Sequence, residues 1–156
     1  MRAVISAGSN MEDSRAHLRS VVEEFAADLV AASPVYATAP WGGVEQPDFL
    51  NQTLLIDAPG TPRDLLARCQ RLEREANRVR DVRWGPRTLD VDIIDIEGVT
   101  SDDPELTLPH PRAGERAFVL IPWLDVDPEA RLGGEKVAGI VEKRREEFAA
   151  QGVRRL

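Results

Sequence analysis

The apolar residues of the chain change their spacing in an order that few folds can accommodate. Short apolar runs, typical of strands, alternate with segments in which apolar residues recur every three or four positions, as on one face of a helix. The predicted order is strand, helix, strand, strand, helix, strand, at residues 3–7, 14–27, 29–36, 49–58, 61–76 and 89–96. Further helices are expected at 117–124 and beyond residue 134. This order indicates an α+β fold, a ferredoxin-like βαββαβ antiparallel sheet with helices on one face plus C-terminal helices.

Breakers and capping residues mark the ends of these segments. Pro34 interrupts the second predicted strand and favours an edge position or a bulge, because proline cannot donate to a strand ladder. Thr61-Pro62-Arg63-Asp64 has the composition of a capped helix start. Gly8-Ser9-Asn10 predicts a turn, and long loops are expected at 38–48 and 77–86. Loops of that length in a compact domain are often functional.

The length and composition suit one domain over residues 1–156. With 42% hydrophobic residues the chain can bury a core, to which Cys69 and Trp123 are expected to belong. A single cysteine excludes an internal disulfide and a cysteine-based zinc site. The N-terminus lacks the charged head and apolar run of a signal peptide, and no stretch is apolar enough to cross a membrane. A cytoplasmic protein is therefore expected.

The net charge of −7 argues against a general nucleic-acid binder, which needs a basic face. An RNA-binding module on a ferredoxin-like sheet would also need exposed aromatic residues, and the predicted strands are aliphatic. The charge is unevenly distributed, however. Eight arginines fall within residues 63–87, against four acidic residues there. Arginine forks match phosphate oxygens, so this local excess suits a small anionic ligand, although compositional bias could also explain it.

These arginines divide into two groups. Four lie on the predicted helix, at positions 63, 68, 71 and 74, where a solvated face with pairs such as Asp64–Arg68 is expected. The other four are predicted to lie in the loop that follows, which contains Gly85 and Pro86; they are Arg78, Arg80, Arg83 and Arg87. Charge stabilisation and alignment are most of what phosphoryl transfer requires of a protein, so the loop group is interpreted as a phosphate clamp.

The segment Leu89-Asp90-Val91-Asp92-Ile93 is the clearest candidate for a metal site. Side chains alternate along a strand, so Asp90 and Asp92 share a face, about 7 Å apart. Magnesium is bound by one or two carboxylates together with substrate phosphates, and this spacing can flank two ions. A strand with one solvated face is the simpler interpretation. Two like charges on one face repel each other, though, and the adjacent arginines favour a magnesium–triphosphate site.

Four segments of the chain resemble the 6-hydroxymethyl-7,8-dihydropterin pyrophosphokinase family. They are GSN (8–10), SPVYATAPWGGVEQPDFLN (33–51), QRLEREANRVRDVRWGPRTLDVDI (70–93) and LPHPRAGERAFVL (108–120). The resemblance extends to about Pro128, and the tail beyond it carries no diagnostic pattern. It implies transfer of pyrophosphate from ATP to the hydroxymethyl group of the reduced pterin, with release of AMP, as a step of folate biosynthesis.

The resemblance also implies a role for individual residues. Asp90 and Asp92 would hold two Mg²⁺ ions, and Arg78 and Arg87 would act in catalysis. The implied ATP-binding residues are Gln70, Glu73, Arg80, Arg83, Trp84, His110 and Arg116. The implied pterin-binding residues are Thr38, Ala39, Trp41, Phe49, Asn51 and Phe118. Loops at 42–46 and 78–84 would close over the reactants and exclude water.

The expected partners are the small molecules ATP and reduced pterin, with no nucleic acid and no membrane, and we expect a monomer. Another two-metal nucleotidyl or phosphoryl transferase on a ferredoxin-like fold stays open as an alternative. It would share the aspartate pair but would lack a pterin pocket.

Overall fold

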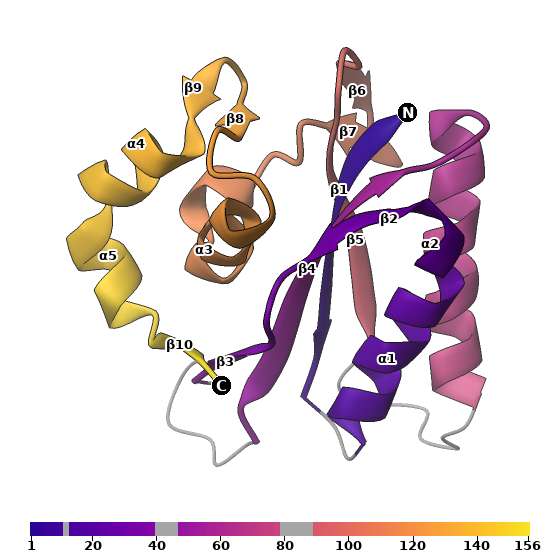
Figure 1. Cartoon of the computed structure of the whole chain (residues 1–156), viewed down its shortest axis with the longest axis horizontal. Coiled ribbons are helices and arrows are strands. Elements are labelled where there is room, and N and C mark those ends of the chain that lie inside the picture. The colour runs from indigo at the N-terminus through magenta and orange to yellow at the C-terminus, as the bar shows by residue number, and fades with distance from the viewer. Residues whose placement is uncertain (11–12, 40–46, 79–88) are drawn as a thin grey trace.

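A six-stranded antiparallel sheet forms the centre of the molecule in the computed structural model, which describes residues 1–10, 13–39, 47–78 and 89–156, without the side chain of Arg78. The strand order is β10-β3-β4-β1-β5, and β2 also pairs with β4 (Figure 1). The strands of this sheet are β1 (Arg2–Ser9), β2 (Leu29–Ala32), β3 (Tyr36–Thr38), β4 (Phe49–Asp57), β5 (Asp90–Ile96) and β10 (Val153–Arg155). The order β5, β1, β4, with β2 and β3 both paired to the other edge of β4, confirms the ferredoxin-like prediction.

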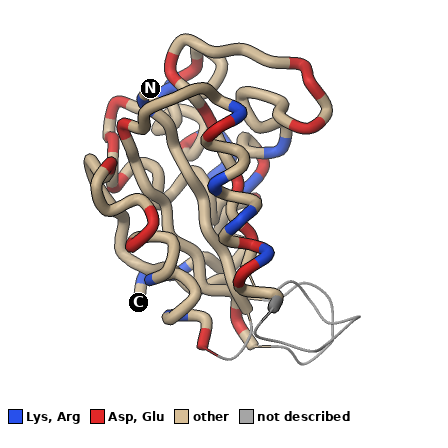
Figure 2. Tube along the Cα trace, turned by 90° about the vertical axis from the view of Figure 1, so that its right-hand side faces the viewer, with Lys and Arg blue, Asp and Glu red and all other residues tan. Residues whose placement is uncertain are grey.

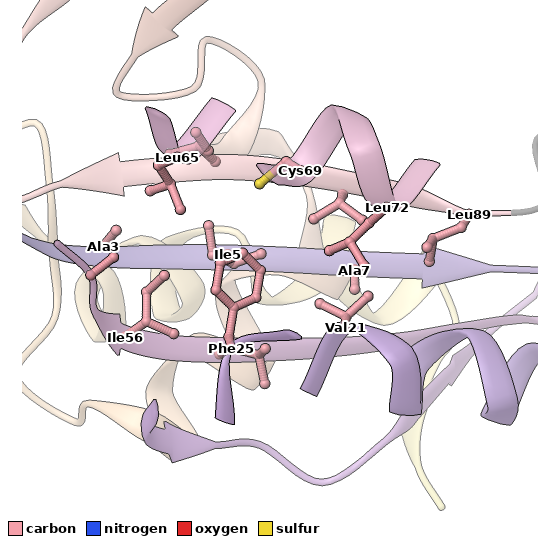
Figure 3. Close-up of a cluster of buried hydrophobic side chains, with 14 of the residues drawn as sticks. Ala3, Ile5, Ala7, Val21, Phe25, Ile56, Leu65, Cys69, Leu72 and Leu89 are labelled. Carbon is pink, nitrogen blue, oxygen red and sulfur yellow. The ribbon is translucent and has the colours of Figure 1, made fainter. Parts of the chain in front are cut away.

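Two helices cover one face of the sheet (Figure 1), α1 (Ser14–Glu24), followed by the 3₁₀ turn η1 (Ala26–Asp28), and α2 (Pro62–Arg78). Figure 3 shows the core beneath them, where Ile5 of β1 lies near Phe25, at the end of α1, with α2 above the strand. Cys69 belongs to this core and is fully buried, as predicted. Because alternate residues of β1 point to this face, the strand presents its remaining side chains to the other face.

The start of α2 has the predicted capping box. The backbone N–H of Thr61 donates to Asp64 Oδ2 at 2.9 Å, and the N–H of Asp64 donates to Thr61 Oγ1 at 3.1 Å. Asp64 is thereby engaged at the helix terminus, and the predicted Asp64–Arg68 pair is wrong. Arg68 binds Glu24 and Asp28, and its guanidinium lies 4.5 Å from the ring centroid of Phe25.

Acidic and basic residues are interspersed along α2 (Figure 2). Arg63 pairs with Asp103 and Glu105, and Arg71 pairs with Glu24. These arginines hold neighbouring elements together and are half-exposed, which agrees with a structural role for the helical group.

The opposite face of the sheet carries the C-terminal helices, α3 (Ala117–Val126), α4 (Val137–Lys143) and α5 (Arg145–Ala150). Trp123 is buried among them, as predicted. The Tyr36 hydroxyl of β3 donates a hydrogen bond to Asp125 of α3, which joins this layer to the sheet. Burial, followed by that carboxylate, raises the pKa of Tyr36 to about 12. None of the described helices is long and apolar enough to pass through a lipid bilayer.

Several local predictions need correction. Gly8 and Ser9 continue β1 instead of forming a turn, because they pair with β4, and Gly8 also pairs with β5. Helix α2 continues to Arg78, so the predicted loop starts later than residue 77. The unpredicted elements are β6 (Ser101–Asp103), β7 (Leu106–Leu108), β8 (Arg131–Leu132), β9 (Glu135–Lys136), β10 and the 3₁₀ turn η2 (Ala113–Glu115). Each has three residues or fewer, too short to show an apolar period. Pro34 separates β2 from β3, as predicted.

Candidate active site

A cavity of about 630 Å³ lies against the sheet face that α1 and α2 leave free. Strands β1, β3, β4 and β5 contribute to it, together with η2, the start of α3 and the residue after α5. Its described lining comprises Ser6, Gly8, Thr38, Ala39, Phe49, Asn51, Asp90, Asp92, Arg112, Glu115, Arg116, Phe118 and Gln151. A cavity of this size can hold a small organic ligand with a charged extension.

Two carboxylates form one wall of the cavity. Asp90 pairs with Gly8 of β1 and Asp92 pairs with Ser6, so both side chains lie on the cavity face of β5. Val91 and Ile93 point into the core on the other face. The alternation inferred from the sequence therefore holds, and it leaves the two aspartates half-buried.

An amide and a hydroxyl are held together on the other side of β1 from the two aspartates. Asn51 Nδ2 donates to Thr38 Oγ1 at 2.8 Å, and both side chains are buried. The Oδ1 atom of Asn51 lies against Gly8, where a Cβ would approach it to 2.9 Å. The absence of a side chain at Gly8 thus permits the close approach of the Asn51 amide. Such an amide can both donate and accept hydrogen bonds.

The start of α3 adds a cation and an aromatic ring. The guanidinium of Arg116 lies 5.6 Å from the ring centroid of Phe118, within the range of a cation–π contact. Arg116 occupies the N-cap position of the helix, and Phe118 lies in its first turn. Arg116 can thus present positive charge to the cavity while Phe118 presents an apolar surface.

His110 lies beside this cavity wall although it is not among the described lining residues. Its backbone N–H donates to the carbonyl of Ile94 at 2.8 Å, and its ring Nδ1 accepts a hydrogen bond from the backbone N–H of Arg112 at 3.2 Å. Burial lowers the pKa of His110, with Asp92 opposing that shift and Arg116 adding to it. The neutral ring therefore carries its proton on Nε2, which can donate to an anion.

Eleven of the sequence-predicted site residues lie in the described part of the chain with their side chains. Eight of them line the cavity, namely Thr38, Ala39, Phe49, Asn51, Asp90, Asp92, Arg116 and Phe118. A ninth, His110, lies next to it. Gln70 and Glu73 are on α2 and are absent from the described lining. Trp41, Arg80, Arg83, Trp84 and Arg87 lie outside the described residues, as does the side chain of Arg78.

The cavity also contains residues that sequence reasoning missed. Ser6 and Gly8 could have been found from the strand period of β1, because they share the face of Val4. Arg112 and Glu115 fall in the PHPRAGER segment but had no assigned role. No sequence pattern indicated Gln151, because it reaches the cavity only through the fold of the C-terminal segment.

The donor set fits a divalent cation that is shared with a bound phosphate. Among the described residues, no group of three or more histidine, cysteine, aspartate or glutamate side chains could hold a metal ion. Asp90 and Asp92 provide two carboxylates on one face. Magnesium commonly takes one or two protein carboxylates and completes its shell with water and phosphate oxygens.

The chain is similar to proteins of one named family. A sequence profile of 7,8-dihydro-6-hydroxymethylpterin-pyrophosphokinase (HPPK) matches residues 4–128. A Mycobacterium tuberculosis protein named 2-amino-4-hydroxy-6-hydroxymethyldihydropteridine pyrophosphokinase is 52% identical over 141 residues, which cover 84% of this chain and 75% of the relative. A Methylorubrum extorquens protein of the same name is 42% identical over 146 residues, covering 91% of this chain and 92% of the relative.

Solved structures share the fold at low sequence identity. A crystal structure of HPPK-DHPS in complex with substrates matches with a TM-score of 0.71 and 12% identity, over 99% of this chain and 46% of that chain. Plasmodium falciparum HPPK-DHPS with pteroate matches with a TM-score of 0.69 and 11% identity, over 99% and 47%. The chain thus spans slightly under half of these solved chains, and at this identity they support the fold alone.

Proposed function

The chain belongs to the 7,8-dihydro-6-hydroxymethylpterin-pyrophosphokinase family, and from that premise we propose that it transfers pyrophosphate from ATP to 6-hydroxymethyl-7,8-dihydropterin. The products are AMP and the pterin diphosphate, in a step of folate biosynthesis. The observation that carries this proposal is a single cavity with a carboxylate pair at one wall and a buried amide–hydroxyl pair at another. Another kind of two-metal transferase is not favoured, since the relatives are named as pyrophosphokinases.

The pterin is proposed to bind at the Asn51–Thr38 wall. Asn51 keeps its Oδ1 atom and one N–H of its amide for the polar edge of a flat heterocycle, while Thr38 fixes the amide orientation. Phe49 and Phe118 line the same space and offer aromatic surfaces to the ring faces. The resemblance adds Ala39, which also lines the cavity, and Trp41, which lies outside the described residues.

The triphosphate is proposed to bind at the carboxylate wall. Asp90 and Asp92 would hold two Mg²⁺ ions, which neutralise phosphate charge and align the reacting groups when they are bound. Arg116 and the Nε2–H of His110 are the described donors beside this wall. Arg112 also lines the cavity and can add positive charge there.

The reaction joins the pterin hydroxyl oxygen to the β-phosphorus of ATP. The bond from that phosphorus to the oxygen bridging to the α-phosphate breaks, and AMP leaves with that oxygen. We propose that Arg78 and Arg87 stabilise the charge that develops between the attacking and leaving oxygens. The remaining ATP contacts, proposed from the family resemblance, are Gln70, Glu73, Arg80, Arg83 and Trp84. No described residue is assigned as the base that accepts the hydroxyl proton.

We also propose that residues 1–156 act as one domain, as a monomer and in the cytoplasm, where ATP is abundant. Light scattering of the purified chain should give a mass near 17.3 kDa. A dimer mass would contradict the proposed monomer without affecting the proposed reaction.

Nucleotide analysis tests the proposed reaction directly. The protein is incubated with ATP, magnesium and the reduced pterin, and the products are separated. AMP should form in equal amount to the pterin diphosphate, and omission of the pterin or magnesium should stop its formation. ADP as the product, or AMP without pterin, would refute the proposal.

A pair of variants on β5 tests the metal wall. Asp92→Asn removes a carboxylate from the cavity, and turnover should fall by about 10³-fold or more, because metal-ion stabilisation contributes several kcal/mol. Asp95→Asn is the matched control, since Asp95 lies on the same strand and is absent from the described lining of the cavity. Its turnover should stay within about twofold of the parent. Equal activity of the two variants would remove the metal assignment.

A further inference from the structure

Gln151 binds both peptide groups that flank Arg116. Its Nε2 donates to the carbonyl of Glu115 at 2.9 Å, and its Oε1 accepts the backbone N–H of Ala117 at 2.9 Å. The side-chain amide therefore pairs with the backbone on both sides of one residue, 34 to 36 positions earlier in the chain. Gln151 itself lines the cavity together with Arg116 and Phe118.

The start of α3 needs such a partner. The first N–H groups of a helix have no acceptor within the helix and are normally satisfied by the N-cap side chain. Here the N-cap residue is Arg116, which has no acceptor atom in its side chain and makes no side-chain cap hydrogen bond. Ala117 is fully buried, so water cannot replace the missing cap at its N–H. Gln151 supplies the acceptor from another part of the chain.

The position of Gln151 is itself fixed from two sides. On one side its N–H donates to the carbonyl of Phe148, a buried residue of α5. On the other side the chain turns at Gly152, with φ of 66°, and enters β10, where Val153 pairs with Thr38. Thr38 is the hydroxyl partner of Asn51, so the segment that carries Gln151 adjoins the proposed pterin wall.

An ion pair adds a third attachment. Arg154 of β10 binds the carboxylate of Asp48, the residue that precedes β4. The C-terminal segment 151–155 thus joins the start of α3, strand β3 and the entry to β4. These are three of the elements that form the cavity.

We propose that Gln151 is a positioning residue of the reaction, which holds the backbone on both sides of Arg116 so that the Arg116 guanidinium keeps its place in the cavity. The inference rests on the proposed function, and it extends the site beyond residues 4–128, the part that matches the family profile. Gln151 acts through Arg116 and need not touch the reacting atoms.

A double-mutant cycle separates this role from a merely structural one. Gln151→Ala should lower kcat/KM by about tenfold or more, because small displacements of binding groups have large effects on turnover. In an Arg116→Ala background the same substitution should lower it by less than about twofold, since the group that Gln151 positions is gone. A structural role predicts the same loss in both backgrounds.

Gln52→Ala is the matched control. Gln52 Nε2 also donates to a backbone carbonyl, that of Ser33 at 2.9 Å, but Gln52 is absent from the described lining of the cavity. This variant should keep kcat/KM within about twofold of the parent. Hydrogen exchange of the peptide that contains Ala117 provides a readout independent of turnover, and Gln151→Ala should speed it while Gln52→Ala should not.

Each result supports or overturns the proposal. Unchanged kcat/KM in Gln151→Ala, or equal losses with and without Arg116, would overturn it. An inactive parent protein would instead contradict the proposed function, and the exchange measurement would still decide whether Gln151 holds the start of α3. If Gln151→Ala does not fold, Gln151→Glu takes its place in the cycle, because it keeps the acceptor for Ala117 and loses the donor to Glu115.

Discussion

Gly8→Ala is expected to weaken pterin binding while leaving the stability of the protein almost unchanged. The added Cβ would lie 2.9 Å from Asn51 Oδ1, closer than real Cβ atoms approach a neighbour. Asn51 must withdraw by roughly half an ångström to restore van der Waals contact. The amide is held by its 2.8 Å hydrogen bond to Thr38, so it cannot move without straining or losing that bond.

Two opposing terms set the effect on stability. Loss of one hydrogen bond costs about 0.5–1.5 kcal/mol. Replacement of glycine by alanine within a strand regains about 0.5–1 kcal/mol of backbone entropy. The free energy of unfolding should therefore change by less than about 1 kcal/mol, which corresponds to a Tm shift of roughly 2–4 °C.

The effect on binding has no such compensation. A displaced amide leaves a buried polar group of the pterin or of the protein unpaired, which costs about 1–3 kcal/mol. Each 1.4 kcal/mol is a factor of about ten, so the Kd for the pterin should rise roughly 5- to 150-fold. Calorimetric titration with the pterin measures this Kd, and thermal unfolding of the same samples measures the stability.

Gly139→Ala is the matched glycine control. Gly139 lies on α4, and no described atom would come within 4 Å of its added Cβ. Alanine should stabilise that helix by up to about 1 kcal/mol and leave the Kd unchanged. A wild-type Kd in Gly8→Ala would refute the steric reasoning. So would a further large loss when Gly8→Ala is added to Asn51→Ala, because the atom that Cβ meets is then missing.

Two further predictions use residues that occur once in the chain. Tyr36 is the single tyrosine, so the phenolate absorbance of the folded protein reports its pKa, expected at about 12. Because this value lies above the ordinary 10.0, the stability that Tyr36 contributes is fully present below pH 10 and is lost as the pH rises toward 12. If Tyr36 titrated near pH 10 while the circular dichroism stayed native, this expectation would be contradicted. Cys69 is the single cysteine, and burial raises its thiol pKa to about 12, so a thiol reagent should label it only as fast as the protein unfolds. Labelling of the folded protein at the rate of a free thiol would show that the packing of α2 does not protect Cys69 from the reagent.

Local pattern was sufficient for most of the fold that surrounds the site. The alternation at Asp90 and Asp92 requires only that the segment is a strand with one buried face, so its geometry follows from the sequence. The capping box at Thr61 and Asp64 is equally local. Strand β10 was missed because three residues carry no period, and because its pairing partner β3 lies more than a hundred positions away.

The sequence pattern could not predict contacts between residues that are distant in the chain. Arg68 is four residues from Asp64, and helical spacing favoured that pair. The fold gives Asp64 a place at the helix cap and brings Glu24 and Asp28 to Arg68 instead. Spacing along a helix describes which residues can meet on that helix, but it contains no information about the neighbouring helix.

The sequence by itself determined the order of strands and helices, the shared face of the two aspartates and, through its motifs, the family of the chain. Only the tertiary structure decided that Gly8 lies against Asn51 and that Gln151, from the C-terminal segment, caps the start of α3. The physical reason is that periodicity and capping act within a few residues, whereas these contacts depend on how separate elements pack. A site formed at the meeting of β1, β4, α3 and the C-terminal segment exists only once all of them are in place.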